Sequence, residues 1–204
     1  MAEQALEKYK SRRNSVSPVQ ADEGRFVIKT FSEEGSFRKE LQIYRLLQNT
    51  NVPCARIIRA ENKTLVLSEL PGRNLVECLE QQEQTGIPVW EVWGKLVEWL
   101  IAFQRHTGFV MTDVNLRNFL YDEKARILYG LDFEQCEVCS MEIPAASVAA
   151  YIRTYDPENT LLKQKISQYV LDLFVQGCGL EADALFQESG RQEMKILERR
   201  KNHK

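Results

Sequence analysis

Two short stretches determine how this sequence is interpreted: MTDVNLRN at residues 111–118 and LDFE at residues 131–134. Between them lie two apolar segments, 119–121 and 127–131, separated by a polar turn. Short apolar segments around such a turn predict a β-hairpin. The polar residue that ends the first stretch and the aspartate of the second therefore bracket the hairpin, fourteen positions apart. We expect both at the same end of it.

The polar residues at that end form a set with a recognisable chemistry. Asp113 and Asp132 each supply a carboxylate, and Asn118, five positions after Asp113, supplies a carboxamide. Hard oxygen ligands of this kind suit Mg²⁺, which usually binds through one or two carboxylates together with phosphate oxygens. The spacing D-x-x-x-x-N is weak alone, but its combination with the hairpin and LDFE is much more specific.

Two charged residues in the first half occupy positions where the local pattern predicts apolar ones. Residues 25–31 alternate and are β-branched or aromatic, which predicts a strand, and Lys29 lies inside it. In the helical pattern that follows, Glu40 lies between Phe37 and Tyr44 on the apolar face. A lone buried charge is unfavourable, so Lys29 and Glu40 could pair. Alternatively, Lys29 reaches solvent from an edge strand and Glu40 sits at the margin of the stripe.

The remaining pattern predicts an α+β fold with a sheet-rich first part and a helical second part. Further strands are expected at 56–59 and 64–68, and the Pro-Gly pair at 71–72 then breaks the chain. Helical patterns follow at 75–84, 88–107, 143–155, 160–177 and 181–200. Residues 1–24 are charged and poorly periodic. We expect a small β-rich lobe over residues 1–70 and a helical lobe over residues 71–204 that holds the hairpin.

The composition excludes several classes of protein. The 204 residues include 27 basic and 29 acidic ones, for a net charge of −2, and 44% are hydrophobic. Such a chain is too apolar to be disordered, and its balance gives no global argument for nucleic acid. No apolar run is long enough to span a membrane, and no signal peptide is visible. Five cysteines, an odd number, indicate reduced thiols, so we expect a cytoplasmic protein.

Taken in order, these features resemble the protein-kinase-like superfamily. The order is a strand lysine, a helix glutamate, a Pro-Gly break, D-x-x-x-x-N, a hairpin and L-D-F-E. The resemblance covers roughly residues 25–175. It is nearest in style to compact atypical members: aminoglycoside and choline phosphotransferases, lipopolysaccharide kinases and small Bud32-type kinases. It implies a bilobal fold with ATP and Mg²⁺ as cofactors, and phosphoryl transfer to a hydroxyl of a small molecule or protein.

The resemblance also implies roles for residues of the first half. Lys29 resembles the lysine that holds the α- and β-phosphates, and Glu40 resembles its partner on the helix. The segment 68–72 resembles the hinge between the lobes, where the backbone of Glu69 and Leu70 would meet adenine.

The second half receives the remaining roles. Asp113 resembles the catalytic-loop aspartate that accepts the proton of the substrate hydroxyl. Asn118 and Asp132 resemble the metal ligands. LDFE matches the D-[FW]-E form of the antibiotic-kinase branch better than D-F-G, and Glu134 could add a carboxylate near the metal.

The sequence departs from the family pattern near the phosphates. No glycine precedes Gly24, so a G-x-G-x-x-G loop is absent. The stretch KSRRNS at 10–15 could replace it with hydroxyl and guanidinium groups, or it is a solvated basic turn. Met111 stands where the family has a histidine, and no A-P-E signature follows Glu134. These departures motivate an alternative function, a degenerate kinase-like module that binds a nucleotide or a protein.

Two further features leave alternatives open. The basic tail at 198–204 is similar to that of Bud32-type kinases, which implies an accessory ATPase in a protein complex. The other interpretation is a solvated helix end whose positive charges favour the helix dipole. Cys136 and Cys139 form a C-x-x-C without a second pair, which is more typical of ordinary cysteines than of a zinc site.

Overall fold

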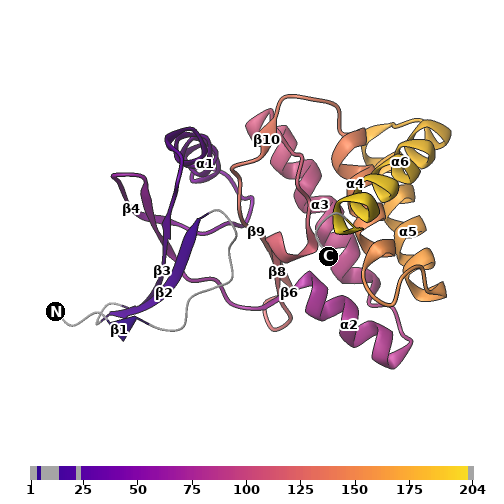
Figure 1. Ribbon diagram of the computed structural model, residues 1–204, viewed down its shortest axis with the longest axis horizontal. Helices are drawn as coiled ribbons and strands as arrows, with labels where there is room; N and C mark the ends of the chain where they lie inside the picture. The colour runs from indigo at the N-terminus through magenta and orange to yellow at the C-terminus, as the bar shows by residue number, and fades with distance from the viewer. Residues whose placement is uncertain (1–3, 6–13, 22–23, 202–204) are drawn as a thin grey trace.

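The computed structural model describes residues 4–5, 14–21 and 24–201 (Figure 1). A five-stranded sheet with the order β1-β2-β3-β5-β4 forms the first part, and each neighbouring pair in it is antiparallel. The strands are β1 (Gln4–Ala5), β2 (Ser15–Ala21), β3 (Gly24–Thr30), β4 (Ile57–Glu61) and β5 (Thr64–Ser68). The sheet lies on one side of the molecule in Figure 1, and most of the helices lie on the other.

Strand β2 lies in the segment that looked poorly periodic in the sequence. It pairs with β3 from Ser15 opposite Thr30 to Ala21 opposite Gly24. Its serines and Pro18 have low strand propensity, and pairing with a strongly β-forming neighbour overrides that preference. Because β2 and β5 flank β3, the strand that carries Lys29 is an interior strand.

Helix α1 (Glu34–Leu47) packs beside this sheet, where the pattern around Glu40 predicted a helix. Residues at helical spacing form its buried face, which is why one side of it is apolar. That face consists of Phe37, Glu40, Ile43, Tyr44 and Leu47. A single carboxylate therefore lies within an otherwise apolar stripe, as the sequence pattern predicted.

The second part contains five helices among the described residues, each within two residues of its predicted bounds. They are α2 (Leu75–Thr85), α3 (Trp90–Thr107), α4 (Glu142–Thr154), α5 (Leu161–Cys178) and α6 (Ala182–Lys201). Asn74 caps α2 by accepting from the N–H groups of Val76 and Glu77. No helix in the described part of the chain is long and apolar enough to cross a membrane.

Short strands connect the two parts. A three-stranded sheet has the order β6-β8-β9, and the remaining two strands pair with each other. The strands are β6 (Arg73–Asn74), β7 (Val110–Met111), β8 (Phe119–Asp122), β9 (Ile127–Gly130) and β10 (Cys136–Glu137). A short 3-10 helix, η1 (Leu116–Asn118), precedes β8. The predicted hairpin is therefore confirmed, with Phe119 opposite Gly130.

One hydrophobic cluster runs from the sheet into the helices. Phe133 lies at its centre with no exposed surface. Its ring contacts Tyr44 of α1 edge to face, at a centroid distance of 4.9 Å, and stacks on Phe103 and Trp99 of α3. A Cβ at Gly130 would lie 2.3 Å from the Trp99 ring, so only glycine allows this approach. The aromatic contacts fix α1 against the loop that holds LDFE.

Gly72 in the Pro-Gly pair has a specific structural role in the connection from β5 to β6. Its φ is +109°, and an added Cβ would lie 2.5 Å from the carbonyl oxygen of Tyr121. Any other residue would clash there and be strained.

Candidate functional site

Lys29 and Glu40 form a buried ion pair between β3 and α1. Lys29 Nζ lies 2.6 Å from Glu40 Oε2, and the two residues are 7% and 1% exposed. Glu40 lies one turn before Tyr44 on the same helical face. The contact of Tyr44 with Phe133 therefore also sets the position of Glu40. The predicted pairing is present, and the alternative in which Lys29 reaches solvent from an edge strand is wrong.

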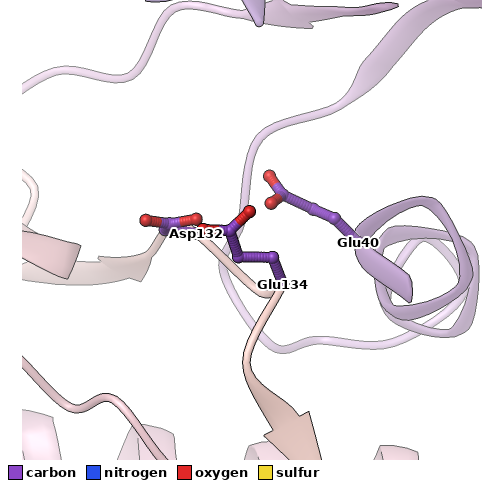
Figure 2. Close-up of side chains that lie close together, drawn as sticks. All are labelled: Glu40, Asp132 and Glu134. Carbon is purple, nitrogen blue, oxygen red and sulfur yellow. The ribbon is translucent and has the colours of Figure 1, made fainter. Parts of the chain in front are cut away.

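Asp132, 103 residues after Lys29 in the sequence, is a second carboxylate partner of Lys29. Its Oδ1 lies 2.6 Å from Lys29 Nζ, so one ammonium group bridges two carboxylates. Asp132 has φ of +60°, a left-handed conformation that aspartate tolerates better than most residues. In the LDFE stretch, Phe133 is buried in the core, while the flanking carboxylates lie on the loop and Glu40 extends toward them from α1 (Figure 2).

Three carboxylates meet around this ammonium group. Ligand oxygens of Glu40, Asp132 and Glu134 all lie within 4.8 Å of one another, and Figure 2 shows them converging from α1 and from the loop after β9. Glu40 Oε1 is buried and has no hydrogen-bond partner in the described part of the chain. With Lys29 the cluster has a formal charge of −2, so its composition fits an additional cation.

The environment shifts the pKa values of the pair. Burial raises the pKa of Glu40 to about 7, assisted by the charge of Asp132 and opposed by that of Lys29. Burial lowers the pKa of the Lys29 ammonium, but Glu40 and Asp132 outweigh this effect and raise it overall. Lys29 is therefore charged at neutral pH, whereas burial makes the negative charge of Glu40 unfavourable, so that this carboxyl group is only partly ionised there.

The loop at 111–118 lies against the LDFE stretch. Asn118 Nδ2 donates to the carbonyl oxygen of Asp113 at 3.1 Å, which fixes the loop between them. The N–H of Leu131 donates to the carbonyl oxygen of Asn118 at 2.8 Å. Asn118 and Asp132 therefore bracket the hairpin as the sequence predicted. Asn118 Oδ1 accepts no hydrogen bond from any residue that the structure describes.

Two tyrosines of the helical part contact this loop, and no pattern in the sequence predicted these contacts. Tyr151 on α4 donates its hydroxyl to Asp113 Oδ1 at 3.1 Å, and Tyr155 donates to Asn115 Oδ1 at 2.8 Å. Burial, followed by the charge of Asp113, raises the pKa of Tyr151 well above its usual value. Both hydroxyls are therefore protonated donors at neutral pH. The sequence around them shows only the apolar pattern of a helix, and no local motif indicates that these tyrosines contact the loop.

The segment compared with a hinge follows β5. The N–H of Glu69 donates to the carbonyl oxygen of Arg25 at 3.3 Å, and its carboxylate pairs with the Arg25 side chain at 2.9 Å. Leu70 is half-buried and packs against the core. Both contacts tie this segment to β3, the strand that also carries Lys29.

Part of the predicted replacement for a glycine loop lies near the carboxylates. Residues 10–13 fall outside the described residues, but Asn14 is nearly buried. Its Nδ2 donates to Glu134 Oε2 at 2.9 Å, and its Oδ1 accepts from the N–H of Ser32 at 3.4 Å. The start of β2 therefore reaches the acidic cluster.

The C-x-x-C pair does not join the acidic cluster. All five cysteines are free, and Cys136 is buried on β10, where burial raises its thiol pKa to about 12. Within the described ranges, the only group of three or more potential metal ligands is the carboxylate cluster. The interpretation of Cys136 and Cys139 as ordinary cysteines is consistent with this geometry. The end of the basic tail, residues 202–204, lies outside the described residues.

Comparison with known proteins identifies the fold. No family model and no curated protein matches the chain. Among solved structures, it is similar to the kinase PK-1 of Cydia pomonella granulovirus, with a TM-score of 0.54 and 21% identity. The match covers 66% of this chain and 54% of the viral kinase, so it spans about half the length of that protein. The chain has a kinase-like fold.

Proposed function

We propose that this protein is an ATP- and Mg²⁺-dependent phosphotransferase that acts on a hydroxyl group. The observation that carries the proposal is the bridge from Glu40 through Lys29 to Asp132. It joins an interior strand, a helix and a loop 103 residues away, at 2.6 Å on each side. A lysine buried between two carboxylates is positioned to take up the phosphates of a nucleotide, which phosphoryl transfer requires.

The acidic cluster fits Mg²⁺ by its donor set. It offers hard carboxylate oxygens and an excess of negative charge, to which the buried Oε1 of Glu40 contributes without a partner in the described part of the chain. Asn118, Asp132 and Glu134 are the proposed ligands, and Asn118 Oδ1 and the carboxylates of Asp132 and Glu134 supply the oxygens. When bound, Mg²⁺ would neutralise charge on the phosphates.

The nucleotide would be held by residues around this cluster. Lys29 would exchange its contact with Asp132 for the phosphates, while Glu40 keeps it oriented. Asn14 would cover the phosphate side in place of a glycine loop. Adenine would meet the backbone of Glu69 and Leu70, between a β-rich lobe at residues 1–70 and a helical lobe at residues 71–204.

Asp113 would accept the proton of the attacking hydroxyl. Phosphoryl transfer depends mainly on positioning and charge neutralisation, so the base needs a fixed orientation more than a perturbed pKa. Tyr151 and Asn118 would supply it, because one donates to the Asp113 carboxylate and the other to its carbonyl oxygen.

The test is transfer from γ-labelled ATP to water and to a panel of hydroxyl acceptors, with and without Mg²⁺. Label release that needs Mg²⁺ and falls by about a hundredfold in Lys29→Met supports the proposal. Lys95→Met on α3, at a half-buried lysine that pairs with Glu98, is the control and should behave as wild type. Equal release from wild type and Lys29→Met would contradict the proposal.

A second candidate is a kinase-like module that binds a nucleotide or a protein without turnover. The observation that favours it is that the proposed base and one proposed metal ligand already have partners within the chain. Asp132 pairs with Lys29, and Asp113 accepts from Tyr151. Stabilisation by ATP without any label release would select this candidate, as would stable capture of a protein partner by a chain that ATP does not stabilise. Slow Mg²⁺-dependent hydrolysis that a protein partner accelerates would instead indicate an accessory ATPase.

A further inference from the structure

A cluster of arginines surrounds the tyrosine next to the proposed catalytic loop. The Tyr155 ring has the guanidinium of Arg117 at 5.8 Å from its centroid and that of Arg200 at 5.4 Å. Arg117 belongs to η1, directly before Asn118, and Arg200 belongs to the last turn of α6. Two elements far apart in the sequence thus bring positive charge to one aromatic side chain.

Several contacts hold Tyr155 and Arg200 in place. The Tyr155 hydroxyl is held by Asn115, and Arg200 donates to the carbonyl oxygen of Thr154. Its ring lies 6.4 Å from that of Tyr151, whose hydroxyl contacts Asp113. The rings of Tyr155 and Tyr151 therefore lie between the arginines and the proposed base, Asp113.

Their charges are not neutralised by neighbouring carboxylates. Within the described part of the chain, neither Arg117 nor Arg200 forms an ion pair, whereas Arg153 and Arg191 of the same helical part do. The acidic groups whose charges raise the pKa of Tyr155 are those of Asp113, the proposed base, and of exposed Glu80 on α2. Arg199, which is exposed, adds a further positive charge near Tyr151.

We infer that this arginine cluster, Arg117, Arg199 and Arg200, binds an acidic segment of a peptide acceptor. The inference rests on the proposed phosphotransferase function and specifies its acceptor class. Guanidinium groups bind carboxylates and phosphates through paired hydrogen bonds, and those beside the catalytic loop have no carboxylate partner in the described part of the chain. Because Arg117 is exposed, the site is open to an extended chain.

The ring contacts also limit where the acidic residues belong. Either guanidinium lies at most about 12 Å from the centre of the Tyr151 ring, and an extended peptide advances about 3.3 Å per residue. Acidic side chains within about four residues of the phosphorylated serine or threonine would therefore reach the cluster.

The inference is tested by binding, without ATP. The probes are two fluorescent peptides with a central serine, one flanked by four glutamates on each side and the other by glutamines. We expect the glutamate peptide to bind about tenfold more tightly at low salt, and Arg117→Gln and Arg200→Gln each to weaken it by about three- to tenfold. Arg117→Lys should retain part of the affinity, because it keeps the charge and loses the paired geometry.

Lys195→Gln is the matched control. Lys195 is exposed on α6, the helix of Arg200, and its charge lowers the pKa of Glu188 rather than that of Tyr155. It should bind both peptides as wild type does. Equal binding of the two peptides would overturn the inference even if label transfer from ATP is observed, so its failure is distinct from that of the proposed function. Tighter binding of an octauridine RNA than of the glutamate peptide, lost in the same arginine variants, would also overturn it.

Discussion

Two groups of charged side chains with little solvent exposure differ in how completely they are paired. In the helical part, half-buried Arg153 on α4 donates to Glu193 on α6 and to two serine hydroxyls, so its charge is balanced and each of its three nitrogens donates a hydrogen bond. In the candidate site, Lys29 lies among three carboxylates, the formal charge is −2, and one buried oxygen of Glu40 has no partner among the described residues.

The difference shows that burial of charge alone does not mark a binding site. A balanced and fully hydrogen-bonded cluster stabilises the fold, since removal of one member leaves the other uncompensated. An unbalanced cluster is unfavourable without a further cation, and a ligand can supply that charge. The Arg153 cluster is therefore assigned to stability and the Lys29 cluster to binding.

The largest effect is expected at the proposed base. Asp113→Ala should reduce phosphoryl transfer by about a thousandfold, because a positioned base contributes two to four orders of magnitude. The same variant should retain its Mg²⁺-dependent stabilisation by ATP, since Asp113 is outside the acidic cluster. Loss of both properties together would mean that Asp113 serves binding or folding instead of proton transfer.

The second prediction breaks the balanced cluster. Arg153→Met should reduce the free energy of unfolding by about 3 kcal/mol, because it leaves Glu193 without its partner in a mostly buried position. Urea denaturation measures the change. Arg191→Met is the control, since its pair with Glu188 is exposed on the arginine side and should contribute less than about 1 kcal/mol. A larger shift of the thermal midpoint by ATP in Arg153→Met than in wild type would contradict the separation of the two clusters.

A smaller effect is expected at Tyr151. Tyr151→Phe removes one hydrogen bond to Asp113 Oδ1, worth about 1 kcal/mol, and should lower the transfer rate about three- to tenfold. The KM for ATP should stay the same, because Tyr151 contacts the proposed base and no member of the acidic cluster. An increased transfer rate would indicate that the tyrosine obstructs the acceptor hydroxyl.

The smallest effect on stability is expected at Glu40. Glu40→Gln removes one charge from an over-negative cluster and leaves Lys29 paired with Asp132. We expect the free energy of unfolding without ligand to stay within about 1 kcal/mol of wild type, in contrast to Arg153→Met. A loss as large as that of Arg153→Met would show that both clusters stabilise the fold in the same way.

Much of the fold could be predicted because its periodicities are local. The five helices of the second part and the hairpin have clear apolar patterns, and Lys29, Glu40 and Asp132 stood out as charges in apolar positions. The kinase-like fold follows from their order. Strand β2 was missed because serines and Pro18 hide its propensity, and only pairing with β3 makes it a strand.

The contacts between distant elements could not be predicted from the sequence. Nothing local indicates that Tyr151 meets Asp113, that Asn14 meets Glu134, or that Arg200 joins Arg117 around Tyr155. These contacts depend on how α4, α6 and β2 pack. That packing is set by apolar surfaces, and an apolar residue in the sequence does not show which other element it will contact. The division into lobes at residue 70 and the ligand roles of Asn118, Asp132 and Glu134 remain predictions.

The central claim is that the unbalanced cluster binds Mg²⁺ and ATP, and thermal unfolding tests it most directly. At ATP concentrations about a hundredfold above Kd, binding adds about 2.7 kcal/mol, which raises the midpoint of a chain of this size by about 5 °C or more. We predict this shift for wild type only when Mg²⁺ is present, and its loss in Asp132→Asn. The same shift in Asp132→Asn, or no Mg²⁺-dependent shift in wild type, would contradict the account.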